Sequence, residues 1–253
     1  LMAGLAEAQP ALPTSTPPLL LIYREEVRPG RAAAHAANEA AWAAAFTKGN
    51  APERWLAMTT VAGPNEAWFM SGYPSYEAYQ KVQDEMSANA VLSAEGDRFS
   101  ALDGEHLNRT STLLAAYRPA LSYQPDVRLP DMRYMQVDIV RVKPGQDSDF
   151  RATWRQIVEA HTKAKMDERW AVYELDAGGP DLTFYFFYPR KSLAEIDKSG
   201  PMHTADGYRD AVGESGRLHQ REMAQRSIEA SQTFIFQLRP QMILLDEPYA
   251  NLD

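Results

Sequence analysis

Short apolar segments alternate with longer segments of helical spacing along most of the chain. Leu19–Val27 and Tyr134–Val142 have the length and the apolar content of β-strands. Each runs into a Pro-Gly pair, where proline presets the bend and glycine can take a positive φ. Apolar residues then recur at helical spacing over about 31–48 and 148–165. The pattern therefore predicts a strand, a tight turn and a helix at two places.

The remaining predicted elements also occur in the same order in both halves. Two strand-like runs flank a loop rich in glycine and proline, and a partly broken helical stretch leads to a closing strand. The expected strands are 55–61, 67–73, 111–117, 170–175, 182–188 and 232–238, and the expected helical stretches are 75–88 and beyond, 192–198 and about 208–226. Each half thus has the order β-α-β-β-α-β, which is typical of ferredoxin-like domains.

An internal repeat relates the two halves. Val27-Arg28-Pro29-Gly30 recurs as Val142-Lys143-Pro144-Gly145, and Glu53-Arg54-Trp55 recurs as Glu168-Arg169-Trp170, both at an offset of 115 residues. One register held through several matches indicates a tandem duplication. We predict an α+β fold of two tandem ferredoxin-like repeats packed as an intrachain α/β barrel. The expected boundaries are 1–18 for an N-terminal tether, 19–124 and 131–244 for the repeats, and 245–253 for a C-terminal tail.

This succession of elements resembles a known superfamily. A Glu-Arg-Trp strand, a hairpin containing Gly and Pro, an aromatic strand ending in Tyr-Pro and a last strand leading to Arg-Pro are similar to the dimeric α/β-barrel superfamily over about residues 19–244. Its members include antibiotic-biosynthesis-type monooxygenases, NIPSNAP-like proteins and chlorite-dismutase-like haem proteins. The resemblance lies in topology, and for an enzyme it implies oxygen chemistry without a nucleotide cofactor.

Composition excludes several classes of function. Lys and Arg number 26 against 34 Asp and Glu, for a net charge of -8, so no nucleic-acid partner is predicted. The longest apolar run, Leu19 to Tyr23, is too short to cross a membrane. Without cysteine there is no disulfide, thiolate ligand or thiol nucleophile. No H-x-x-x-H pair occurs, and no metal is predicted.

The two ends of the chain carry further patterns. Residues 1–8 resemble the end of a signal peptide with an A-x-A cleavage site, which predicts a periplasmic or secreted protein; a cytoplasmic one is the alternative. Residues 242–253 resemble the Walker B segment and D-loop of ABC-transporter ATPases. The phosphate-binding G-x-x-x-x-G-K-[ST] loop is absent from the sequence, so ATPase activity is not predicted.

Histidines stand at core-facing positions of both first helices. His35 occupies the place of Phe150, and His161 the place of Phe46. A histidine in a core needs a hydrogen-bond partner or a ligand. Each is therefore either a pocket residue or a boundary residue at a helix end. The superfamily resemblance adds His203 as a candidate haem ligand, against a solvated loop histidine. His106 and His219 lie on charged helical stretches and are expected at the surface.

Aromatic residues supply the remaining candidates. Trp68 and Tyr173 differ from their counterparts at the 115-residue offset, and with Tyr185 they are suited either to a flat apolar ligand or to ordinary core packing. Trp55 and Trp170 recur with the repeat and are expected in the core. The candidate pocket residues are His35, Asn38, Trp42, Trp68, His161, Tyr173, Tyr185 and His203.

The predicted function is binding of a small apolar or aromatic molecule. One alternative is an enzyme, either a haem protein with His203 or His161 as ligand or a cofactor-independent monooxygenase that holds its substrate with His35, Asn38 and Trp68. Another is a non-catalytic, homo-oligomeric assembly module whose barrel would be filled with side chains. No cofactor is assigned beyond the haem alternative.

Overall fold

The structure is a computed structural model that describes residues 16–199 and 206–245. The first half contains β1 (Leu19–Val27), α1 (Ala32–Lys48), β2 (Leu56–Ala62), β3 (Glu66–Tyr73), α2 (Tyr76–Ser87), α3 (Ala90–His106) and β4 (Leu107–Tyr117). The second half contains β5 (Tyr134–Val142), α4 (Asp147–Ala164), β6 (Ala171–Ala177), β7 (Thr183–Arg190), α5 (Ala194–Ser199), α6 (Asp206–Ser227) and β8 (Ile228–Leu238). The described residues also form the 3-10 turns η1 (Pro119–Leu121), η2 (Leu129–Asp131) and η3 (Pro240–Met242).

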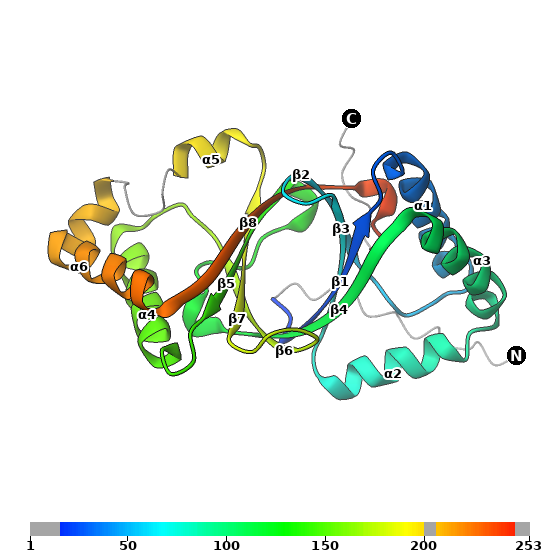
Figure 1. The fold of residues 1–253 in the computed structure, drawn as a ribbon, viewed down its shortest axis with the longest axis horizontal. Helices are drawn as coiled ribbons and strands as arrows, with labels where there is room; N and C mark the ends of the chain where they lie inside the picture. The colour runs from blue at the N-terminus through cyan, green and yellow to red at the C-terminus, as the bar shows by residue number, and fades with distance from the viewer. Residues whose placement is uncertain (1–15, 200–205, 246–253) are drawn as a thin grey trace, which may run out of the picture.

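The strands of the described residues close into one antiparallel barrel in the order β1-β3-β2-β8-β5-β7-β6-β4. Helices α1 and α3 pack together at one end of the long axis, α4 and α6 pack together at the other end, and the barrel lies between them (Figure 1). The predicted α+β class is confirmed, and the closed barrel agrees with the predicted α/β barrel.

The second helical region of the first half is divided by a single cap, in agreement with the predicted partly broken stretch. The side-chain oxygen of Asn89 accepts hydrogen bonds from the backbone N–H groups of Val91 and Leu92, at 3.1 and 3.2 Å, and starts a new helix there. The break therefore lies between α2 and α3, next to the predicted end of the first part at residue 88. The helices that precede β4 and β8 run directly into these strands, which begin at Leu107 and Ile228, earlier than predicted.

Aromatic side chains fill the middle of the barrel. The Trp68 ring lies 6.2 Å from that of Tyr185, 5.5 Å from that of Phe234 and 4.8 Å from that of Phe236, between ring centroids. All four are buried, and aliphatic residues from both halves pack around them. Burial of this apolar area is the main force that holds the two halves in one barrel.

Each half also covers a tryptophan of the other. The indole N–H of Trp170 in the second half donates to the carbonyl of Leu121 in η1, and that of Trp55 in the first half donates to the carbonyl of Met242 in η3, both at 2.7 Å. Both tryptophans are buried, as predicted. The 3-10 turn after each closing strand is therefore a structural part of the opposite half.

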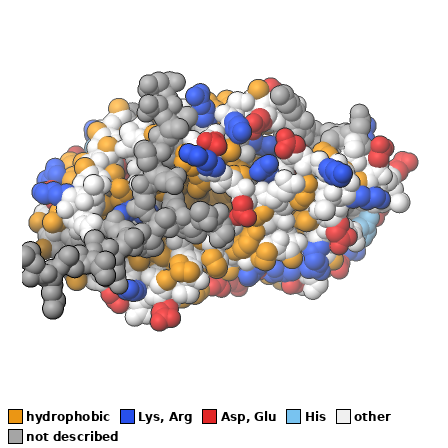
Figure 2. Space-filling view, turned by 180° about the vertical axis from the view of Figure 1, so that it is seen from behind, with side chains coloured by type: hydrophobic (Ala, Val, Ile, Leu, Met, Phe, Trp, Pro, Cys, Tyr) orange, Lys and Arg blue, Asp and Glu red, His pale blue; other side chains and the backbone are white. Residues whose placement is uncertain are grey.

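Several sequence predictions concern the ends and the surface. Residues 1–8, with the signal-like pattern, lie outside the described residues, as does the tail from 246 onward. Of the described helices, none has the length and apolarity that crossing a bilayer requires. Acidic and basic side chains are interspersed on the face drawn in Figure 2. His219 is exposed as predicted, but the prediction for His106 is wrong: it is buried where α3 meets β4.

Candidate functional site

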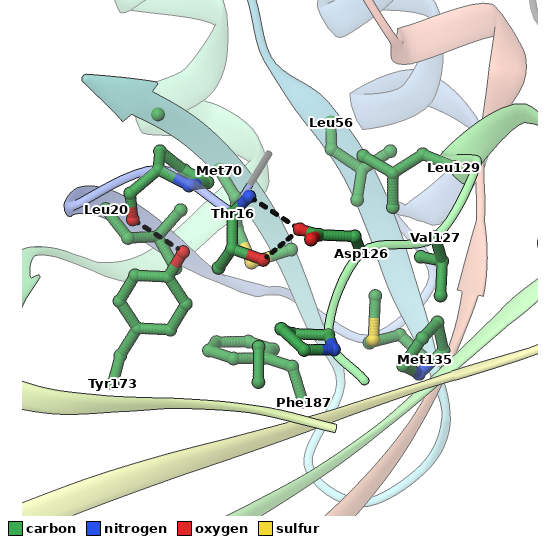
Figure 3. Close-up of a pocket in the computed structure, with 15 residues that line it drawn as sticks. Thr16, Leu20, Leu56, Met70, Asp126, Val127, Leu129, Met135, Tyr173 and Phe187 are labelled. Atoms are coloured by element: carbon green, nitrogen blue, oxygen red, sulfur yellow. Dashed lines mark hydrogen bonds between the residues drawn. The ribbon is translucent and has the colours of Figure 1, made fainter. Parts of the chain in front are cut away.

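A cavity of about 150 Å³ lies at the barrel end where β1, β2, β5 and β6 begin and β3 and β7 end (Figure 3). We call it the barrel-mouth cavity. Its walls come from both halves. The linker that joins the halves between β4 and β5 closes one side with residues from the segment 125–129. The lining residues are Thr16, Pro17, Leu20, Leu56, Met70, Gly72, Pro125, Asp126, Val127, Leu129, Met135, Ala171, Tyr173, Phe187 and Pro189. The cavity is thus largely apolar, with a few polar groups.

The polar groups of the cavity hold Thr16 and Pro17, which we call the N-terminal segment, by hydrogen bonds. The Asp126 carboxylate accepts hydrogen bonds from the backbone N–H and the hydroxyl of Thr16, at 3.0 and 3.1 Å. The Tyr173 hydroxyl donates to the carbonyl of Pro17 at 2.9 Å (Figure 3). Burial, with added repulsion from Tyr117 and Asp126, raises the pKa of Tyr173, so its hydroxyl remains a proton donor at neutral pH.

Small residues at two wall positions leave room for the cavity. Ala171 stands 115 residues after Leu56, so the second half has a methyl group where the first has a full leucine side chain. Gly72 stands 115 residues before Phe187. A Cβ at Gly72 would lie 2.5 Å from Cγ of Pro17, so only glycine lets the N-terminal segment cross this strand so closely.

Of the described sequence candidates, Tyr173 lines the barrel-mouth cavity, and Trp68 and Tyr185 lie in the filled middle of the barrel. The Trp68 indole N–H donates to Glu66 at 2.6 Å, and the Arg24 guanidinium lies 4.6 Å from the ring centroid. Trp68 therefore packs as a core residue with its polar edge satisfied. His203 lies outside the described residues.

His35, Asn38 and Trp42 lie elsewhere, on the face of α1 that meets α3 and the outer side of β1. The His35 Nε2 is 2.6 Å from a carboxylate oxygen of Glu25. Asn38 donates to Asp103 at 2.5 Å, and the Trp42 indole N–H donates to the other Asp103 oxygen at 3.1 Å. These three candidates are brought together around two acids, the buried Glu25 and the half-buried Asp103, and do not line the barrel-mouth cavity.

The sequence prediction did not include these acids as site residues. Glu25 comes from β1 and Asp103 from the far end of α3, so only the fold places them beside α1. One local signal was available, because His35 and Glu39 are four residues apart on one helix face. Burial raises the pKa of Glu25, and burial with repulsion from Glu25 and Asp103 raises that of Glu39 to about 10.

His161 is fully buried between α4, α6 and the sheet. Its Nδ1 is 2.8 Å from the carbonyl oxygen of Ile157, and its Nε2 is 2.8 Å from a carboxylate oxygen of Glu168. The rings of Trp170 and Tyr208 each lie 4.8 Å from the imidazole. Both ring nitrogens are thus occupied, and aromatic side chains fill the space around them.

Neither His35 nor His161 is placed to ligate a haem group. Haem ligation by histidine needs an available ring nitrogen facing a roomy pocket. Both nitrogens of His161 are bonded to protein groups, and neither His35, which is buried beside Glu25 and Glu39, nor any other described histidine lines the barrel-mouth cavity. Haem ligation by His203 stays a sequence prediction, because that residue lies outside the described part.

A buried glutamate of the first half gives a prediction for the pH dependence of stability. Glu53 accepts a hydrogen bond from the Tyr73 hydroxyl, and burial raises its pKa. The folded state then holds this proton at higher pH than the unfolded state, so the group's contribution to stability falls as pH rises above about 4.5. Glu53→Gln keeps an acceptor for Tyr73 without the charge.

We therefore expect the stability of Glu53→Gln relative to wild type to increase as the pH is raised from 4 to 8. The expected increase is about 1.4 kcal/mol for each unit by which folding raises the pKa of Glu53. Urea unfolding of both proteins at the two pH values measures it. An equal difference at both pH values would contradict the prediction.

Comparison with known proteins identifies the fold. No protein-family model and no curated protein matches the sequence. Among solved structures, a candidate monooxygenase from Fusobacterium nucleatum matches with a TM-score of 0.55 and 14% identity, over 87% of this chain and 91% of that chain. An anthrone oxidase-like protein matches with a TM-score of 0.55 and 12% identity, over 91% and 94%. A candidate chlorite dismutase matches with a TM-score of 0.54 and 12% identity, over 90% and 97%. At these identities the likeness is one of fold.

Proposed function

We propose that the protein binds a small apolar molecule, about as large as one aromatic ring, in the barrel-mouth cavity. The observation that carries the proposal is an apolar cavity of about 150 Å³ with Tyr173 and Asp126 at its edge. An engineered cavity of about this volume in another protein stays dry and binds benzene. An aromatic ring bound here would move from water into contact with apolar side chains, which is favourable. The Tyr173 hydroxyl and the Asp126 carboxylate would orient a polar substituent on the ring.

The proposal rests on a barrel of two ferredoxin-like repeats, as in the dimeric α/β-barrel superfamily. Three observations support this origin: the strand order β4-β1-β3-β2 parallels β8-β5-β7-β6, the order of elements repeats, and the matching sequence motifs keep an offset of 115 residues. The cavity then lies where corresponding ends of the two repeats meet, and their differences at Ala171 and Gly72 shape it.

A cofactor-independent, monooxygenase-like activity on the bound molecule is the second candidate. The structures with this fold include a candidate monooxygenase and an anthrone oxidase-like protein. His35 and Asn38 lie on the outer side of the sheet and Trp68 in the barrel, so these three do not form one substrate contact. Tyr173 and Asp126 are the groups beside a ligand in the cavity. The assembly-module alternative predicts a filled barrel. Side chains do fill the middle of the barrel, and the barrel-mouth cavity at one end is the feature that favours ligand binding.

Methionine methyl groups offer a direct test. Met70 and Met135 line the cavity, whereas Met58 lies in the barrel middle and Met223 in the core of the second half. With ¹³C-methyl methionine, titration with benzene, toluene, phenol and indole is expected to shift the Met70 and Met135 signals by ring currents and to leave Met223 unchanged. If none of the four probes shifts Met70 or Met135, the proposal fails.

Two variants sharpen the experiment. Ala171→Leu places in the second half the side chain that the first half has at Leu56, which fills the cavity and is expected to abolish the shifts. Tyr173→Phe keeps the walls but removes the hydroxyl, so binding of phenol is expected to weaken more than binding of toluene. Oxygen uptake in the presence of the tightest-binding probe separates a binding protein from an oxygenase.

A further inference from the structure

A second site is suggested by three buried side chains outside the barrel. Glu25 extends from the outer side of β1, and His35 and Glu39 from successive turns of α1. Their exposed fractions are 2%, 1% and 6%. One potential ligand atom from each, an imidazole nitrogen and two carboxylate oxygens, lies within 4.8 Å of the others. We call this group the Glu25-His35-Glu39 cluster.

One potential metal-ligand atom of the cluster has no hydrogen-bond partner. The Oε1 of Glu39 is buried and forms no hydrogen bond, although it lies 3.8 Å from Nε2 of His35 and therefore faces the cluster. A buried carboxylate oxygen normally has a hydrogen bond or a cation. Within the described residues, the ion pairs of Glu25 and Glu39 are made to His35, with no lysine or arginine. The cluster thus places two buried carboxyl groups beside one imidazole.

The second half shows that the fold does not require polar residues here. At the 115-residue offset, Val140, Phe150 and Trp154 take the places of Glu25, His35 and Glu39. The rings of Phe150 and Trp154 pack 6.2 Å apart in an apolar core. Since the same position between helix and sheet is filled by apolar side chains in one half, the acids and histidine of the other half need an explanation other than packing.

We propose that Glu25, His35 and Glu39 bind one divalent transition-metal ion. An imidazole nitrogen with two carboxylate oxygens suits zinc, manganese, iron or cobalt, whereas magnesium and calcium prefer oxygen ligands alone. Ligands of one such ion, at about 2.1 Å from it, lie roughly 3 to 3.5 Å apart, so small rotations of these side chains would bring the three atoms to that spacing. A bound cation would favour the ionised form of both carboxyl groups and give Glu39 Oε1 its missing partner.

Neighbouring groups are placed to hold the ligands. Asp103 of α3 lies next to Glu39 and accepts hydrogen bonds from Asn38 and from the indole of Trp42. Polar groups that orient metal ligands commonly change affinity by 10- to 100-fold when they are removed. Asp103, Asn38 and Trp42 are therefore assigned as positioning residues, and Asp103→Asn is expected to weaken metal binding within that range.

The test is metal binding by the full chain. Metal-free protein is titrated with Zn²⁺ and Co²⁺ by calorimetry, and one equivalent is expected to bind. Glu39→Gln and His35→Gln are each expected to lower Zn²⁺ affinity by at least about 100-fold. Glu168→Gln is the matched control: it removes the carboxylate paired with the other buried histidine, His161, and is expected to leave Zn²⁺ affinity unchanged.

A second measurement locates the ion without a variant. Co²⁺ in the cluster is expected to broaden the indole N–H signal of Trp42, which bonds to Asp103, and to leave that of Trp170 in the second half sharp. The proposal is overturned if no stoichiometric binding of Zn²⁺ or Co²⁺ occurs. It is equally overturned if Glu39→Gln binds like wild type, or if the Trp42 signal stays sharp at saturating Co²⁺.

Discussion

Trp170→Ala is expected to lower the free energy of unfolding by about 3–5 kcal/mol, the range for removing a fully buried large aromatic side chain. The indole is fully buried, and its ring packs against those of Tyr123, Trp154, His161 and Tyr188, at centroid distances from 4.8 to 6.3 Å. Its loss removes these contacts and leaves a cavity. Urea unfolding followed by far-ultraviolet circular dichroism measures the change.

Two variants resolve the sources of that loss. Trp170→Phe keeps a ring but leaves the Leu121 carbonyl without its donor, and is expected to cost about 1–3 kcal/mol. Trp55→Ala removes the counterpart in the first half, which is 7% exposed and packs edge-on against Phe46. A smaller loss is expected there. Equal losses for Trp55→Ala and Trp170→Ala would show that the aromatic surroundings of Trp170 do not set the cost.

Gly178→Ala is expected to lower the free energy of unfolding by about 3 kcal/mol or more. Gly178 follows β6 and has a φ of +96°, which other residues rarely adopt. A Cβ there would lie 2.2 Å from the backbone oxygen of Thr112 in β4, an atom that cannot move without disturbing the pairing of β4 with β6. This pairing is one of the two places where the halves join to close the barrel.

A second glycine with a positive φ serves as the control that separates the steric clash from the backbone cost of Gly178→Ala. Gly145, in the Pro-Gly turn after β5, has a φ of +79° and no neighbour within 4 Å of an added Cβ. Gly145→Ala therefore has the backbone cost alone, about 1–2 kcal/mol. Thermal unfolding of the two variants measures the difference, and a Gly178→Ala protein as stable as Gly145→Ala would contradict the clash.

Most of the fold could be predicted from the sequence because two independent signals agree. Hydrophobic periodicity places the strands, and the 115-residue offset indicates that the halves share one plan. Helix boundaries that depend on one hydrogen-bonding side chain are harder to predict from the sequence. Asn89, for example, sets the start of α3 by capping its N-terminus. The closed strand order needs pairings between the halves, β2 with β8 and β4 with β6, which have no local signature.

The sites were harder to predict than the fold. Helical spacing placed His35, Asn38 and Trp42 on one face, and the structure has all three around Asp103 and Glu25. The two acids come from other elements, and an acidic residue in a strand or helix is usually exposed. No local pattern therefore marks Glu25 as buried or Asp103 as half-buried. The barrel-mouth cavity depends on the linker and the N-terminal segment, whose paths follow from tertiary contacts alone.

The 3-10 turns η1 and η3 each cover a tryptophan of the opposite half. The linker between the halves therefore decides whether the assembled barrel depends on protein concentration. η1 covers Trp170 and η3 covers Trp55, so a chain cut between β4 and β5 would yield two fragments that each lack a cover for their own tryptophan. Each fragment would also present two unpaired strand edges, β2 and β4 in one and β6 and β8 in the other. Such fragments would depend on bimolecular assembly, whereas the intact linker supplies each half with its partner at an effective concentration fixed by covalent connection. Dilution that would separate the fragments leaves the continuous chain assembled.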